Sequence, residues 1–122
     1  MKALANDMER LEQYRVTLEK VLHEHAQLSQ QVRAEHPNDP ENPAEAIAVC
    51  DPKTDNYLLI TAGWTPSQRI HSILAHFRII DEQIYIEWSG IEDLIEDLID
   101  QGIPKSAFLP AQPQHFTSSP AI

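Results

Sequence analysis

The sequence predicts an α+β domain in which a long N-terminal helix packs on a four-stranded antiparallel meander sheet, with a second short helix after the sheet. Three observations predict this fold: an apolar stripe with helical spacing over residues 1–35, four β-rich runs joined by short turns, and an amphipathic segment after residue 88. The 122 residues fit a single domain, which we expect to span residues 1–122.

The N-terminal helix is expected over residues 1–35, which contain no Gly or Pro and are rich in strong helix formers. Asn6 followed by Glu9 resembles a capping box, which favours a helix start near Asn6. A helix of this length measures about 45 Å, longer than the body of a small domain. We therefore expect the helix either to break or to overhang and offer its stripe to another chain. The stripe consists of Leu4, Met8, Leu11, Tyr14, Leu18, Leu22 and Leu28.

The Pro-rich connector of residues 36–45 ends the helix, because proline interrupts both helices and sheets. The sheet and the second helix are expected within residues 46–109, and residues 110–122 form a C-terminal tail. The predicted strands span residues 46–50, 57–64, 69–80 and 83–88. Ser89 with Glu92 predicts a capping box at the start of the second helix, and Gly102 ends it.

The charge distribution argues against direct DNA binding. The net charge is −10, and residues 81–100 hold eight acidic residues and no basic one. The nine Lys and Arg residues are scattered, whereas DNA affinity depends on clustered bases that neutralise phosphates. The sequence contains no run of about 20 apolar residues, so we expect no membrane span. Cys50 is the only cysteine, so no internal disulfide is possible, and we expect a cytoplasmic protein.

Residues capable of chemistry form no convincing catalytic set. His71 and His76 are five apart on a predicted strand, which places them on opposite faces unless a bulge intervenes. Asp51 and Lys53 have the acid-x-Lys spacing of a nuclease metal site, but Pro52 places them in a turn. A small metal-dependent hydrolase or nuclease that uses Asp51, Lys53 and histidines remains an alternative. We expect no metal and no cofactor.

Several segments, read in order, resemble the XisI family of fdxN element excision controlling factors, known best from cyanobacteria. The resemblance implies a compact α+β fold and an accessory role in programmed DNA element excision. It also implies a XisH-like companion with a nuclease fold, and no catalytic activity in the XisI-like chain. The matching segments are Leu11-Glu12-Gln13-Tyr14-Arg15, Asp55-Asn56-Tyr57-Leu58-Leu59, Gly63-Trp64, Arg69-Ile70-His71, His76-Phe77-Arg78-Ile79, Ile84-Tyr85-Ile86-Glu87 and Gly102-Ile103-Pro104-Lys105.

The predicted function is therefore that of a non-enzymatic, partner-binding regulator. The residues expected to bind the partner lie in the matching segments and are polar, except for a glycine and a tryptophan next to it. Gly63 would permit an unusual backbone angle, and Trp64 would either anchor an interface or pack in the core. A further alternative is a structural protein that self-associates through its long N-terminal helix. The candidate residues are Gly63, Trp64, Arg69, His71, His76 and Lys105.

Overall fold

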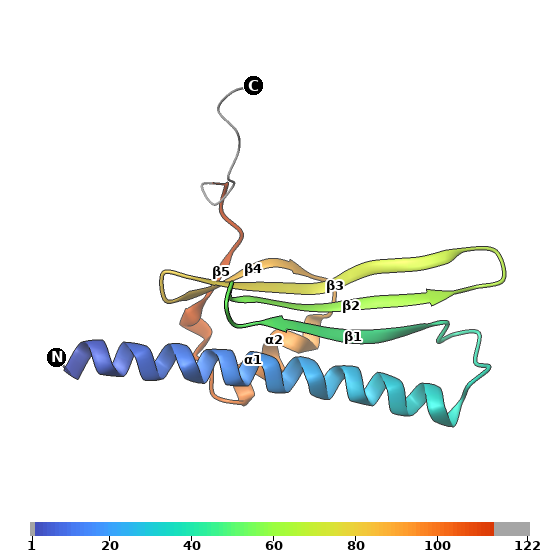
Figure 1. The fold of residues 1–122 in the computed structure, drawn as a ribbon, viewed down its shortest axis with the longest axis horizontal. Coiled ribbons are helices and arrows are strands. Elements are labelled where there is room, and N and C mark those ends of the chain that lie inside the picture. The colour runs from blue at the N-terminus through green and yellow to red at the C-terminus, as the bar shows by residue number, and fades with distance from the viewer. Residues whose placement is uncertain (1, 114–122) are drawn as a thin grey trace, which may run out of the picture.

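A five-stranded sheet carries both helices on one of its faces (Figure 1). The computed structural model describes residues 2–113, with side chains from residue 8 onward. The strands lie in the order β1-β2-β3-β4-β5, so neighbours in the sequence are also neighbours in the sheet. The elements are α1 (Lys2–Glu35), β1 (Ala44–Asp51), β2 (Asn56–Trp64), β3 (Arg69–Ile80), β4 (Gln83–Ser89), α2 (Glu92–Asp100), a 3₁₀ turn η1 (Lys105–Ala107) and β5 (Phe108–Pro110).

Helix α1 forms over nearly the whole predicted range and begins at Lys2, before the expected start at Asn6. Its apolar stripe packs on the sheet, where Tyr14, Leu18 and Leu22 are almost fully buried. The helix is unbroken, and its N-terminal part extends past the end of the sheet, so of the two expected alternatives the overhang is observed (Figure 1). Two members of the stripe, Met8 and Leu28, remain 64% and 61% exposed.

The first four strands form the predicted antiparallel meander. Each antiparallel pair is joined by a short connection, and the β3–β4 hairpin has a two-residue loop between Ile80 and Gln83. Both loop residues, Asp81 and Glu82, have positive φ angles of 50° and 67°. Positive φ at both central positions matches the right-handed twist of the flanking strands, and Asp tolerates this conformation better than most residues.

The expected four-stranded, purely antiparallel sheet is wrong in one detail. After α2 the chain returns and adds β5, which pairs in parallel with β4 from Ile84↔Phe108 to Ile86↔Pro110. Phe108 also packs edge-on against Phe77 of β3, with ring centroids 6.4 Å apart. Pro110 is tolerated there because an edge strand has one side without ladder hydrogen bonds. The class, α+β, is as predicted.

Helix α2 starts later than the predicted capping box implies. Its N-cap is Ile91, with no side-chain cap, because Ser89 is still a strand residue that pairs with Ala75. Leu94 and Leu98 are fully buried, and the acidic side chains lie on the opposite face. His25 Nε2 lies 2.9 Å from Asp97 Oδ2, which joins the middle of α1 to α2. Both helices therefore pack as one layer beneath the sheet.

An ion pair between distant segments fixes the β1–β2 turn. Arg15 of α1 donates from Nε to Asp55 Oδ1 at 2.8 Å and from Nη2 to Oδ2 at 3.1 Å. Tyr57 donates its hydroxyl to Asp55 Oδ1 at 3.1 Å. The first two segments that carry the family resemblance are thus brought into direct contact. These hydrogen bonds to the Asp55 carboxylate also hold Asp55 in its positive φ conformation of 55°.

Candidate functional site

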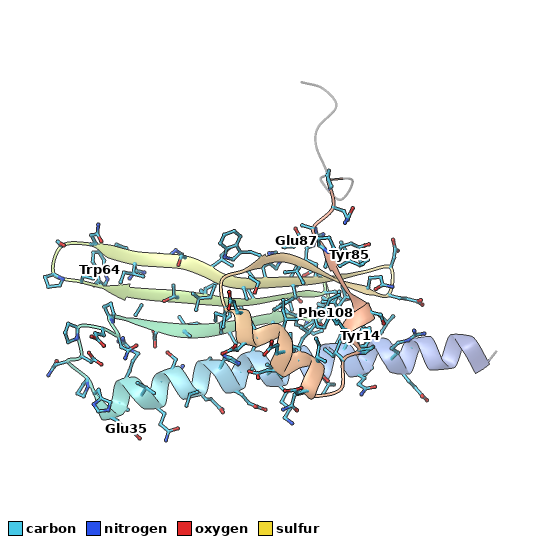
Figure 2. The ribbon with its side chains drawn as sticks, turned by 180° about the vertical axis from the view of Figure 1, so that it is seen from behind. Tyr14, Glu35, Trp64, Tyr85, Glu87 and Phe108 are labelled. Carbon is cyan, nitrogen blue, oxygen red and sulfur yellow. The ribbon has the colours of Figure 1, made fainter. Side chains whose placement is uncertain are left out.

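The β2–β3 hairpin continues well beyond the end of β4 (Figure 1). The last pair between β3 and β4 is Ala75↔Ser89, whereas β2 and β3 stay paired as far as Trp64↔Arg69. We call residues 60–73 the arm, and we call the sheet face away from α1 and α2 the outer face. Figure 2 shows Trp64 at the tip of the arm, at the same end of the molecule as Glu35. The arm is therefore the part of the sheet with the least cover.

A β-bulge at the base of the arm brings the two predicted histidines to the same face. The β2–β3 register passes from Leu59↔Ala75 to Ile60↔Ile73, which leaves Leu74 as an extra residue in β3. An extra residue reverses the alternation of side chains, so an odd separation becomes equivalent to an even one. His71 and His76 consequently both line the outer face. The spacing of the two histidines predicts opposite faces unless a bulge intervenes, and the structure contains that bulge.

Between these histidines lies an open groove of about 540 Å³, which we call the outer groove. Its apolar part is well exposed, since Ile73 is 46% and Trp88 59% exposed. Isolated exposed apolar side chains are common, whereas here an exposed tryptophan and an exposed isoleucine line the same concave surface. The lining residues are Ile60, His71, Ser72, Ile73, His76, Glu87 and Trp88.

The polar groups of the outer groove are positioned by their neighbours. His76 Nε2 donates to Asn56 Oδ1 at 2.9 Å, and burial lowers the pKa of His76, which favours the neutral ring. Glu87 lies 3.8 Å from Arg78 Nη1, at the long end of an ion pair. Its Oε1 is buried and has no hydrogen-bond donor among residues 2–113. The groove thus combines an apolar wall with one carboxylate that lacks a full set of donors.

The arm is free of acid in an otherwise acidic chain. Residues 56–80 contain no Asp or Glu, although the whole chain has a net charge of −10. The same stretch holds two arginines and the histidines of the outer groove. The acidic residues concentrate in residues 81–100, in and before α2. A partner that approaches the arm meets much less negative charge than one that approaches α2.

Trp64 and Arg69 form a pair at the tip of the arm. The Arg69 guanidinium lies 5.0 Å from the centre of the Trp64 ring, and its Nη1 donates to the Gly63 carbonyl at 3.2 Å. Trp64 is 67% exposed, which excludes the core-packing alternative. Gly63 is needed for close approach rather than for an unusual backbone angle. An added Cβ would meet Pro43 O at 2.2 Å, and Gly63 has no positive φ.

Four of the six predicted residues therefore share the outer face. They are Trp64, Arg69, His71 and His76. Lys105 is exposed at the start of η1 and does not line the outer groove. The sequence did not single out Ile60, Ile73 or Trp88. A signal was present, because Leu58 and Ile60 are apolar on the face opposite Leu59.

The alternative nuclease site gains no support from the structure. The Asp51 carboxylate accepts hydrogen bonds from Lys53 N at 3.0 Å and Thr54 Oγ1 at 2.8 Å, so it stabilises its own turn. These bonds, with Thr54 first, lower the pKa of Asp51. Within the described part of the chain, no three His, Cys, Asp or Glu residues are grouped to hold a metal ion. The same part contains no helix long and apolar enough to cross a bilayer.

Comparisons with known proteins agree with this architecture. The family described as "XisI protein" matches residues 8–118. The chain belongs to the XisI protein family. A crystal structure of the fdxN element excision controlling factor XisI from Anabaena variabilis ATCC 29413 superposes with a TM-score of 0.64 at 21% identity, over 86% of this chain and 96% of that one. A XisI-like protein from the same organism gives a TM-score of 0.50 at 22% identity, over 75% and 84% of the two chains. No curated protein matches the chain.

Proposed function

We propose that this XisI-family chain is a non-enzymatic accessory protein that controls excision of a DNA element by binding a protein partner. The observation that carries the proposal is the exposed outer groove on the helix-free face of a family member. The resemblance in sequence suggests a XisH-like, nuclease-fold protein as the partner. In this proposal the cytoplasm is the site of action, in keeping with the single cysteine.

Binding rather than catalysis fits the chemistry of the outer groove. An acyl or phosphoryl transfer site needs a nucleophile beside a base, or a metal with its ligands. The histidine that is best positioned, His76, uses Nε2 to bond Asn56. What the groove offers instead is the flat ring of Trp88 beside Ile73, the kind of surface that anchors an apolar side chain of a partner.

The acidic charge supports an indirect route to DNA. A chain with a net charge of −10 is repelled by phosphates, and its bases form no stripe that could follow a DNA backbone. The two properties fit together if the partner touches the DNA and this chain touches the partner. Direct DNA contact is therefore no part of the proposed function.

The test is co-expression with a XisH-like protein, followed by affinity purification at low and moderate salt. We expect the two proteins to co-purify, and Trp88→Ala to weaken the complex at least about tenfold, as the loss of an interface anchor does. Val16→Ala removes a similarly exposed apolar side chain, 56% exposed on α1, and should leave the complex unchanged. Failure of the unmodified chain to co-purify would remove the partner. Unchanged binding by Trp88→Ala would remove the outer groove as the contact.

A further inference from the structure

The arm has a free strand edge on the side of β3 that β4 leaves unpaired. The β4 strand ends opposite Ala75, and Gly90 N then donates to Leu74 O at 2.7 Å before the chain turns into α2. Among the strands of residues 2–113, none pairs with β3 on that side between Arg69 and Ile73. An unpaired edge exposes a row of backbone donors and acceptors that can pair with another strand.

The register of the hairpin shows which backbone groups face this edge. Thr65 N donates to Gln68 O at 2.8 Å, so the adjacent pair Trp64↔Arg69 is a non-hydrogen-bonded pair. In agreement with this, Trp64 N points away from β3 and donates to Pro43 O at 3.3 Å. Hydrogen-bonded and non-hydrogen-bonded pairs alternate along an antiparallel ladder. The N–H and C=O groups of Arg69, His71 and Ile73 therefore point to the free edge.

The other two edges of the sheet are protected. Along β1, Ala46 N donates a hydrogen bond to Ser29 Oγ at 3.2 Å, and α1 packs beside the strand (Figure 1). At the opposite side, β5 has only three residues and ends in Pro110. The arm edge has little of the usual protection. Residues 69–73 contain no Pro, Lys or acid, and the bulge lies beyond them. Their one charged side chain, Arg69, has its guanidinium on the Trp64 ring and the Gly63 carbonyl.

We infer that two copies of this chain associate through the arm edge, with β3 of one copy pairing antiparallel to β3 of the other. The edge is self-complementary when the two-fold axis passes midway between the His71 residues of the two copies. In that register Arg69 of each copy exchanges both backbone hydrogen bonds with Ile73 of the other, and the two His71 residues exchange theirs. Such a two-fold contact uses the same surface of both copies.

The limits of the edge select this register. At one end the Leu74 carbonyl is already bonded by Gly90, and at the other the Gln68 carbonyl is bonded by Thr65. Only residues 69–73 have free groups, and a shift of the register would leave some of them without partners. Buried backbone groups without partners are strongly disfavoured. The pairing centred on His71 is the one that uses them all.

The charge distribution also points to a second copy at this edge. Two chains of net charge −10 repel each other, and this repulsion is weakest where neither presents a carboxylate. Residues 56–80, which carry the edge, contain no Asp or Glu. The pairing sets Arg69 opposite Ile73 and brings no two arginines together. Because salt screens this repulsion, association of two copies should strengthen as salt is raised. If an acidic segment of another protein bound at Arg69 instead, its binding would weaken as salt is raised.

The first test is the oligomeric state of the full chain by light scattering, over a range of about 10–200 μM because dimerisation depends on concentration. We expect a mass twice 13.9 kDa. His71→Pro should weaken association at least about tenfold and leave the fold intact, because the N–H that it removes faces the free edge. His71→Ala keeps that N–H and should remain dimeric. A monomeric unmodified chain overturns the inference, and so does a folded His71→Pro variant that dimerises like the unmodified chain.

A cross-linking test decides the matter if His71→Pro does not fold. Directly paired residues in such a ladder have Cα atoms about 5.5 Å apart, within the range that a disulfide spans. In a Cys50→Ser background, His71→Cys should therefore cross-link two copies under mild oxidation. Ser72→Cys in the same background lies off the two-fold axis and should not. Absence of the His71→Cys cross-link, or an equal cross-link from Ser72→Cys, overturns the pairing.

Discussion

The Arg15–Asp55 pair gives the sharpest test of how the fold is held together. We consider Arg15→Met, which keeps the length of the aliphatic stem but removes the guanidinium. The pair is bidentate, with donor–acceptor distances of 2.8 and 3.1 Å, and the two side chains are 30% and 19% exposed. Loss of Arg15 leaves the Asp55 carboxylate with the Tyr57 hydroxyl as its one side-chain donor among residues 8–113.

The expected magnitude lies between two limits. A fully exposed ion pair contributes about 0.2–1 kcal/mol, whereas a hydrogen bond to a charged group contributes about 1.5–3 kcal/mol. For a bidentate pair that is mostly shielded from water, we expect Arg15→Met to lower the free energy of unfolding by about 2 kcal/mol. We expect a coupling energy of about 1.5 kcal/mol between Arg15 and Asp55.

The assay is a double-mutant cycle of Arg15→Met and Asp55→Asn, measured by urea unfolding. Asn is chosen because it tolerates the positive φ of 55° at this position, so the change removes charge without adding backbone strain. Glu12→Gln is the matched control, since Glu12 lies 3.7 Å from Arg15 Nη1 but is 67% exposed. It should change stability by less than about 0.5 kcal/mol. A coupling energy below about 0.3 kcal/mol would refute the claim that the Arg15–Asp55 ion pair stabilises the fold.

Three further predictions concern the sheet. Because burial lowers the pKa of His76 below its ordinary value of 6.5, the unfolded chain binds this proton first, and stability should fall as the pH drops below about 6.5. His76→Gln should flatten that part of the pH profile, measured as the urea midpoint. Gly63→Ala should cost about 2 kcal/mol or more in thermal unfolding, because its Cβ would lie 2.2 Å from Pro43 O. Gly90→Ala, whose nearest contact would be 3.2 Å, should cost clearly less. Burial raises the pKa of Cys50 to about 11, so iodoacetamide at pH near 8 should alkylate it roughly 100-fold more slowly in the folded than in the unfolded chain.

Local patterns in the sequence predicted most of the fold. The spacing of Tyr14, Leu18 and Leu22 identified the face of α1 that packs on the sheet, because helical periodicity is a property of neighbouring residues. The short strand β5 was missed for the opposite reason. It pairs with a strand that lies more than 20 residues earlier, and its sequence has no period of its own. At Ser89, pairing with β3 prevailed over capping of α2.

The candidate site was predicted in part. Trp64, Arg69, His71 and His76 were chosen as a set, but nothing in the sequence placed both histidines on one face. That depends on Leu74, an ordinary apolar residue that becomes the extra one only because β2 and β3 pair in a shifted register. Register is decided by pairing across two strands and is therefore hidden from the pattern of either strand alone.

The two-fold pairing has a consequence for the number of chains in a partner complex. An antiparallel contact between strands in one sheet plane has its two-fold axis perpendicular to that plane, so both outer faces point in the same direction. The outer groove of each copy includes His71, next to the axis, and Ile73, two residues further along β3. The two grooves would thus lie side by side and present two equivalent docking sites to a partner.

We therefore expect the purified complex to contain two copies of this chain, as measured by native mass spectrometry. His71→Pro should reduce this to one copy and weaken the complex, because a dimer holds a bivalent partner at a high effective concentration. Trp88→Ala should act differently, since it should weaken partner binding and leave the dimer intact. One copy per complex for the unmodified chain would contradict the prediction, because pairing at the arm edge and binding at the outer groove would then exclude each other.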